Sequence, residues 1–185
     1  MSTVYFATSN QYKFDEFTRL FALSKVDLRQ IVLDISEIQT MDYASIAEAK
    51  SVEAYRQTGM PIMTEVCGIG IDALDGFPSG LNRSFWETLG PKVSTITNAI
   101  GSAAHADVWL SICDGRRIHH SSETSRGQIA PAPSSQGTFH LDQVFIPEGA
   151  SKTLADMDTT ERDFHSYRAK VVPNMAKLLK SLGVV

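Results

Sequence analysis

The chain has 185 residues and a formal net charge of −4. This length can bury a sizeable hydrophobic core in one compact domain, and 43% hydrophobic with 21% charged residues is typical of a soluble globular protein. The negative net charge argues against a general nucleic-acid-binding surface. No apolar run approaches the ~20 residues that cross a bilayer, and the N-terminus does not resemble a signal peptide. We therefore expect one domain over residues 1–185, in the cytoplasm.

The first half of the chain alternates apolar strand-like runs with amphipathic helix-like runs. Residues 3–7 and 26–32 are predicted as strands, and the segment between them as a helix with apolar positions from Phe14 to Leu23 on one face. Residues 43–59 have helical composition, and Gly59 and Pro61 end that helix. Residues 61–74 are predicted as a pair of strands.

The second half mixes helices with hairpins. Residues 80–100 are predicted as helical with a break at 90–91, and residues 106–113 as a strand that turns at 114–115 into a second strand. A loop is expected over 126–137 and a short strand end over 144–147. An acidic capping box at 158–161 precedes a C-terminal helix with a kink near Pro173. Strands interspersed with helices predict an α/β fold with a mixed sheet.

Small polar residues separate the first strand from the first helix. Thr8, Ser9 and Asn10 lie there, and Lys13 follows one turn into the helix. Free backbone N–H groups at a helix start bind phosphate, and a nearby lysine adds positive charge. The simpler interpretation is a helix cap followed by a solvated lysine.

Two carboxylates are candidates for metal binding. Glu37 lies in a polar-apolar connector, and Glu65 lies in an apolar strand where an unpaired charge is costly. Mg²⁺ is usually held by one or two carboxylates together with substrate phosphates. The alternative for Glu65 is an exposed strand face.

Two further groups lie in the last quarter of the chain. Phe139 and Asp142 pair an aromatic ring that can stack on a base with an acid that can accept its N–H groups. Arg162 and Ser166 share a helix face at i and i+4, with Arg168 further round. A packed loop and a solvated basic face are the respective alternatives.

Taken together in this order, these segments resemble the inosine triphosphate pyrophosphatase family over nearly the whole chain. The matching segments are Ala7-Thr8-Ser9-Asn10 with Lys13 and Glu16-Phe17, Ile35 to Gln39, Thr64 to Gly68, Asp72 to Pro78, Gly137 to Gly149, Thr153 to Met157, and Glu161 to Arg168.

The resemblance implies a two-lobed α/β fold with an elongated central mixed sheet flanked by helices and a nucleotide cleft between the lobes. It also implies a homodimer, a small-molecule nucleotide substrate, and Mg²⁺-dependent hydrolysis between the α and β phosphates to a monophosphate and pyrophosphate. By position, the catalytic residues would be Glu65, Glu37 and Lys13, with Glu37 and Glu65 also serving the metal. The substrate-binding residues would be Thr8, Asn10, Lys13, Arg83, Phe139, Asp142, Arg162, Ser166, Tyr167 and Arg168.

The chain departs from the family pattern at several of these positions. Val66 replaces the second of two adjacent acids, and valine can neither accept a proton nor bind Mg²⁺. Tyr167 replaces a histidine that contacts the base, and other changes include Leu141 and Gln143. Three hypotheses follow: a pyrophosphatase with altered base specificity in which Glu65 or Glu37 activates water, a catalytically impaired nucleotide-binding pseudoenzyme, or a hydrolase of another nucleotide in the same cleft.

Overall fold

The structure, a computed structural model, describes residues 2–90, 92–137 and 139–184. Its strands form a six-stranded sheet in the order β2-β1-β3-β4-β5-β6. β1 runs parallel to β2 and β3, whereas β5 and β6 are antiparallel, so the predicted α/β fold with a mixed sheet is confirmed. The strands are Ser2–Ala7 (β1), Val26–Ile31 (β2), Ile62–Ile71 (β3), Ala103–Cys113 (β4), Ile118–Ile129 (β5) and Phe145–Pro147 (β6).

Several of the described helices begin at a residue whose side chain caps the helix. Asp42 accepts from the N–H groups of Ala44 and Ser45 at the start of α2, and Gly59 ends α2 with a φ of 67°. The predicted capping box before α6 is confirmed, because Asp158 and Glu161 satisfy each other's backbone N–H groups. The helices are Gln11–Ala22 (α1), Tyr43–Thr58 (α2), Asn82–Leu89 (α3), Lys92–Ile100 (α4), His140–Val144 (α5), Thr159–His165 (α6) and Tyr167–Ser181 (α7).

The chain divides into two compact units. The first unit comprises the chain up to Val66, Val108–Glu123 and the segment from Arg168 onward; the second comprises Cys67–Asp107 and Thr124–Tyr167. Within the described ranges, no helix is both long enough and apolar enough to cross a membrane.

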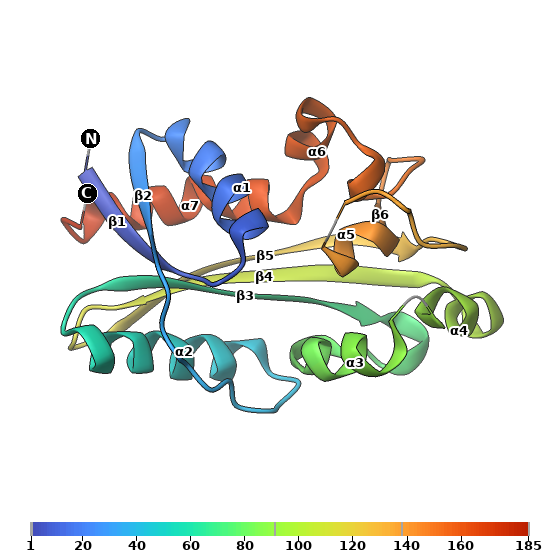
Figure 1. The fold of residues 1–185 in the computed structure, drawn as a ribbon, viewed down its shortest axis with the longest axis horizontal. Helices are drawn as coiled ribbons and strands as arrows, with labels where there is room; N and C mark the ends of the chain where they lie inside the picture. Colours follow the sequence, from blue (N-terminus) through green and yellow to red (C-terminus); the bar gives the residue numbers. More distant parts are fainter. Residues whose placement is uncertain (1, 91, 138, 185) are drawn as a thin grey trace. The chain divides into compact units, whose positions relative to one another are not determined.

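In the first unit, helices cover both faces of the strands. α1 and α7 lie on one face and α2 on the other (Figure 1). Phe17 on α1 packs edge-on against Phe6 on β1, with ring centroids 5.3 Å apart. α2 is fixed through Ser111 on β4, whose hydroxyl lies 2.9 Å from the Thr64 hydroxyl and donates to the backbone oxygen of Ala47. This buried chain of hydrogen bonds sets the position of α2 against β3.

In the second unit, a buried asparagine joins α3 to β3. The side-chain oxygen of Asn82 accepts from the backbone N–H of Ile69 and from the indole N–H of Trp86, both at 3.1 Å. Phe85 packs edge-on against Phe77, with centroids 5.6 Å apart. The polar and aromatic contacts together hold α3 where β3 ends.

Several sequence predictions need correction. Residues 61–74 do not form two strands, because the apolar run pairs as one strand, Ile62–Ile71, followed by a 3-10 turn, Asp72–Leu74. The loop predicted from residue 126 begins later, because β5 pairs with β6 as far as Ile129. Leu23, predicted on the apolar face of α1, is 82% exposed because it lies beyond the end of that helix.

The C-terminal helix is interrupted at a different place from the predicted one. Ser166 adopts an extended conformation with a ψ of 128° and separates α6 from α7. Pro173 lies inside α7. Consequently Arg162 and Arg168 belong to different helices and, by their unit boundaries, to different units.

Candidate active site

The loop between β1 and α1 is held by its own side chains. The Asn10 side chain accepts from the backbone N–H of Lys13, and the Thr8 hydroxyl accepts from the N–H of Asn10, both at 3.1 Å. Gln30 on β2 donates to the backbone oxygen of Thr8 at 3.1 Å. The loop therefore leads into a capped helix start, the local geometry that favours an anionic group.

Lys13 and Glu65 form a close ion pair in the first unit. The Lys13 amine lies 2.7 Å from Oε2 of Glu65, whose side chain is 2% exposed. Burial of a carboxylate without a partner would be costly, so this pair explains how an acid is tolerated in an apolar strand. The predicted residues Lys13 and Glu65 are thus brought together, and the exposed-face alternative for Glu65 does not apply.

Arg168 extends this pair into a buried ionic cluster. Its Nη1 donates to Oε2 of Glu16 on α1 at 2.9 Å, and its Nε lies 3.7 Å from Oε1 of Glu65. The Arg168 side chain is fully buried. Glu16 was absent from the predicted site, although its charge among the apolar positions of α1 was a usable signal.

Lys50 is a second residue that the sequence prediction missed. Its amine donates to the Glu37 carboxylate and, at 3.0 Å, to the backbone oxygen of Glu65. Lys50 therefore links the Glu37 carboxylate to the backbone of β3 at Glu65, whereas the Glu65 carboxylate contacts Lys13. The signal was its spacing, because Lys50 lies four residues after Ile46 and three after Ala47, on the buried stripe of α2.

Val66 lies on the face of β3 opposite to Glu65, as strand alternation requires. It is 8% exposed and belongs to an apolar cluster with Tyr43, Ile46 and Ala47 of α2, against which Trp109 packs. The position at which the family pattern has a second acid is thus filled by packed hydrocarbon. A carboxylate placed there would lose most of its hydration.

The residues present fit a metal-binding role only in part. Within the described ranges, no group of three or more His, Cys, Asp or Glu residues could hold a metal ion. One carboxylate oxygen of Glu37 makes no hydrogen bond or ion pair with a described residue, and the side chain is 33% exposed. Glu65 is buried against Lys13. Because Mg²⁺ commonly uses one carboxylate together with substrate phosphates, Glu37 fits the ion and Glu65 does not.

The predicted base-binding residues lie in the second unit, apart from Arg168. Phe139 precedes α5, and Asp142 on α5 is buried. At the end of α6, the backbone oxygen of Arg162 accepts a hydrogen bond of 2.7 Å from the N–H of Ser166. Ser166 and Tyr167 are buried.

Arg83, predicted to bind phosphate, lies on the surface of α3. Its side chain is 77% exposed, and its Nε lies 3.1 Å from the carboxylate of Glu87, one turn further along the helix. Such an exposed pair stabilises a helix only slightly, so Arg83 can exchange this partner for an anion.

Several carboxylates with clearly lowered pKa values lie on or beside α2 and at the β4–β5 turn. The Ser45 hydroxyl and backbone N–H lower the pKa of Asp42, which caps α2. A hydrogen bond from Arg56 lowers the pKa of Glu53 on α2 to about 2. At the β4–β5 turn, a hydrogen bond from His119 lowers the pKa of Asp114. These acids stabilise the scaffold, including the helix that carries Lys50.

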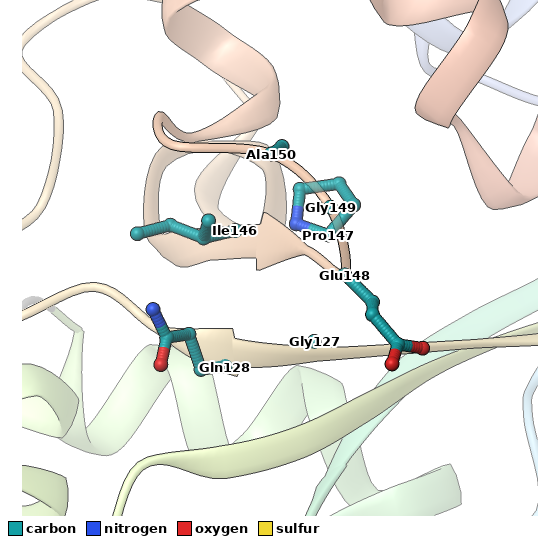
Figure 2. Close-up of a pocket in the computed structure, with 7 residues that line it drawn as sticks. All are labelled: Gly127, Gln128, Ile146, Pro147, Glu148, Gly149 and Ala150. Atoms are coloured by element: carbon teal, nitrogen blue, oxygen red, sulfur yellow. The ribbon is translucent and has the colours of Figure 1, made fainter.

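A shallow pocket of about 260 Å³ lies in the second unit beside β5 and β6 (Figure 2). It is lined by Gly127, Gln128, Ile146, Pro147, Glu148, Gly149 and Ala150. A Cβ atom at Gly127 would approach the backbone oxygen of Ile146 to 2.3 Å, so the close strand approach requires glycine there. None of these seven residues belongs to the predicted site.

Comparison with known proteins connects this geometry to a family. The chain matches the Ham1 family over residues 4–178. It is 26% identical over 179 residues to the dITP/XTP pyrophosphatase of Hyperthermus butylicus, covering 96% of this chain and 94% of that protein. It is 28% identical over 182 residues to the dITP/XTP pyrophosphatase of Methanopyrus kandleri, covering 96% of each.

Solved structures show the same fold. A HAM1 protein from Coxiella burnetii superposes with a TM-score of 0.80 at 21% identity, covering 98% of this chain and 100% of that one. The Staphylococcus aureus Ham1 protein gives a TM-score of 0.74 at 18% identity over 97% of this chain and 98% of that one. The family match extends over nearly all of the sequence, and this chain belongs to the Ham1 family.

Proposed function

We propose that the protein is a nucleoside triphosphate pyrophosphohydrolase. It cleaves the α–β phosphoanhydride of a purine or modified nucleotide to a monophosphate and pyrophosphate. The observation that carries this proposal is the joining of Lys13, Glu65, Lys50 and Glu37 in one unit, beside a capped phosphate-type loop. The dITP/XTP pyrophosphatase names of relatives at 26–28% identity support the reaction class.

The triphosphate end of the substrate is assigned to the first unit. The Thr8 hydroxyl, the side-chain amide of Asn10 and the Lys13 amine bind the phosphates. Arg83, a residue of the second unit, is assigned to phosphate binding from its position in the family pattern alone. Glu37 would hold Mg²⁺ together with the phosphates, and the ion would neutralise their charge. We assign the remaining substrate contacts to Lys50, whose amine already lies beside Glu37.

The base is assigned to residues of the second unit. Phe139 stacks on the base, Asp142 accepts its N–H groups, and Arg162 contributes positive charge at its edge. Ser166 and Tyr167 follow Arg162 in the sequence and are buried, and we assign them to the shape of the base pocket. We assign the altered base preference to Tyr167, which replaces the histidine of the family pattern.

Hydrolysis here depends mainly on positioning and on neutralising phosphate charge. A water oxygen attacks the α-phosphorus, the bond to the bridging oxygen breaks, and the electron pair leaves with pyrophosphate. Val66 cannot take the proton from that water. Glu65 is buried against Lys13 and the accessible oxygen of Glu37 would hold the ion, so the proton would pass to solvent from a water that the bound ion makes more acidic.

A second candidate function rests on Val66. This valine takes the position of the second acid in the family pattern and is packed in an apolar cluster, as expected for a nucleotide-binding pseudoenzyme. A hydrolase of a nucleoside monophosphate or sugar nucleotide is a third candidate, which differs in releasing no pyrophosphate.

A product assay separates these candidates. The protein is incubated with Mg²⁺ and a panel of standard, deaminated and modified nucleoside triphosphates, with parallel samples containing EDTA, and pyrophosphate, phosphate and monophosphates are resolved. Pyrophosphate with one preferred monophosphate, abolished by Glu37→Gln, supports the proposal. Nucleotide binding without turnover supports the pseudoenzyme instead. The homodimer stays a prediction from the family resemblance, and the cytoplasmic location stays a prediction from the sequence. Sedimentation of the purified protein tests the former.

A further inference from the structure

Phe139 and Asp142, two of the residues assigned to the base, lie where the backbone has little regular structure. The described residues between β5 and α5 are irregular, and α5 itself has only five residues. Its N-cap residue is Phe139, whose side chain cannot accept a hydrogen bond. A helix this short is not stable by itself in water, so other segments must hold it in place. The contacts that hold α5 therefore also set where the base can bind.

Gln143 on α5 holds the backbone that precedes Phe139. Its side-chain amide donates to the backbone oxygen of Gly137 at 3.0 Å and to that of Gln136 at 3.3 Å. Only the amide nitrogen of Gln143 can make these bonds, because both partners are acceptors. The backbone oxygen of Gln143 also accepts the N–H of Ser134 at 2.8 Å. One residue thus bonds three positions of the irregular segment.

Ser134 connects the same segment to a 3-10 turn, Leu154–Asp156 (η3). Its hydroxyl donates to the Asp156 carboxylate and accepts the backbone N–H of Gln136 at 2.9 Å. The other carboxylate oxygen of Asp156 accepts from the Thr153 hydroxyl at 2.7 Å. The segment before Phe139 is therefore anchored to η3, and Gln143 joins this anchor to α5.

A ring contact with α3 holds the start of α5. The imidazole of His140 stacks on the indole of Trp86, with centroids 6.5 Å apart and an angle of 22° between the planes. Trp86 is fixed in turn, because its indole N–H donates to the side chain of Asn82. In the sequence, Phe139 is thus preceded by a bonded backbone oxygen at Gly137 and followed by a stacked ring.

We propose that Gln143 is a positioning residue for the base. Its side-chain amide holds the backbone that carries Phe139 and Asp142, and through them it sets the affinity for the nucleotide and the preference among bases. Gln143 is one of the positions at which this chain departs from the family pattern, so these hydrogen bonds are a feature of this chain. The effect on nucleotides rests on the proposed function, whereas the effect on the backbone does not.

The first test measures the backbone without any nucleotide. Amide hydrogen exchange is followed by NMR in the wild type, in Gln143→Met and in Gln128→Met. Methionine has about the length of glutamine but no N–H donor. Gln128 is an exposed residue of β5 in the same unit, so its substitution makes the same chemical change away from α5.

We expect Gln143→Met to speed exchange of the Ser134 and Gln136 N–H groups about three- to tenfold, which corresponds to the loss of one net hydrogen bond. The N–H of Gly76, which donates to the backbone oxygen of Ile71, is the internal reference and should not change. Gln128→Met should match the wild type at all three N–H groups.

Unchanged exchange in Gln143→Met overturns the proposal. Equal acceleration at the Gly76 reference reports a general loss of stability and also counts against it. If Gln143→Met does not fold, Gln143→Glu is measured instead with the same expectation, because a carboxylate of the same shape accepts hydrogen bonds but cannot donate them.

The second test measures nucleotide binding and kinetics. Gln143→Met should raise Kd and KM about three- to tenfold for the preferred nucleotide with little change in kcat, and should narrow the KM ratio between the preferred and the poorest base. The effect should shrink in a Phe139→Leu background, because both changes act on the same contact.

A purely structural role for Gln143 predicts a lower urea midpoint with unchanged KM and unchanged base ranking, and that result contradicts the proposal. Fully additive effects with Phe139→Leu contradict it as well. If the wild type neither binds nor hydrolyses any nucleotide, the proposed function is rejected, and the exchange experiment still decides whether Gln143 holds this backbone.

Discussion

Lys50 donates a hydrogen bond of 3.0 Å to the backbone oxygen of Glu65, which fixes an amine of α2 against β3. The same amine donates to Glu37 and so sets the position of the accessible carboxylate. Removal of one preorganised donor that faces the charge developing in the transition state lowers the rate by about 10²–10³.

We therefore expect Lys50→Met to lower kcat by about 10². Glu37 loses its partner at the same time, which adds to the loss. Steady-state kinetics on the preferred nucleotide measure this effect, with Lys152→Met as the control. Lys152 pairs with Glu161 on the surface, so its removal gives the same change in net charge and should leave kcat unchanged. Equal kinetics for the two variants would remove Lys50 from the site.

Most of the fold could be predicted from local patterns. β1, β2 and α2 each lie within two residues of the predicted ranges, and α1 lies in the segment predicted as helical, because alternating apolar runs and strong caps such as Asp42 and Gly59 define them. The single strand β3 was mistaken for two, because its extent depends on pairing with distant segments. The α6–α7 break at Ser166 was mislocated because proline is the stronger local signal.

The sequence predicted only those residues of the candidate site that lie at positions of the family pattern. Lys13, Glu37 and Glu65 were identified by position, but Lys50 and Glu16 were not. Their roles depend on contacts across 15 and 152 positions of sequence, which neither composition nor periodicity contains. Their only local signal is a charged residue on the buried stripe of a helix, and that signal alone does not identify the partner.

Stability should depend on pH through the cap of α2. Hydrogen bonds from Ser45 lower the folded-state pKa of Asp42 below its ordinary value. A carboxyl whose pKa is lower in the folded state stabilises above the unfolded pKa, near 4, and this stabilisation is lost as the pH falls through the lower folded value. We expect Asp42→Asn, which keeps an acceptor but no charge, to lower the urea midpoint at pH 7 more than at pH 3.

The measurement is the difference between wild type and variant at each pH, because other carboxyls also titrate. Asp34→Asn, an exposed position before α2, controls for the loss of a surface charge and should show no such pH dependence. Equal differences for Asp42→Asn at both pH values would show that the charge of Asp42 does not contribute to the cap.

Phe139 should contribute to nucleotide binding through stacking. We expect Phe139→Leu to raise KM about three- to tenfold with little effect on kcat, because an aromatic pair contributes about 0.5–1.5 kcal/mol beyond area burial. Leucine preserves most of the volume, so folding should be retained. Phe164→Leu is the control, because Phe164 is 78% exposed on α6. If both variants bind equally, Phe139 has only a packing role.

Substitution of Arg83 tests substrate binding with little effect on folding. Its exposed pair with Glu87 contributes little to folding, so Arg83→Ala should change the free energy of unfolding by less than about 0.5 kcal/mol. If Arg83 binds phosphate as proposed, KM should rise about tenfold and the rise should shrink in high salt. Glu87→Ala, which frees the guanidinium, should not raise KM. An unchanged KM in Arg83→Ala would exclude this residue from the site.

Substitution of Val66 distinguishes an active enzyme from a pseudoenzyme. Its side chain belongs to the buried cluster with Tyr43, Ile46 and Ala47, so Val66→Asp should lower the free energy of unfolding by about 1–3 kcal/mol through burial of a carboxyl. If Glu37 already serves the water through the ion it would hold, the new acid should not raise turnover of the preferred nucleotide. Val66→Thr, which is isosteric but uncharged, controls for polarity. Turnover that is undetectable in the wild type and appears only in Val66→Asp would instead establish that the native protein binds nucleotides without hydrolysing them.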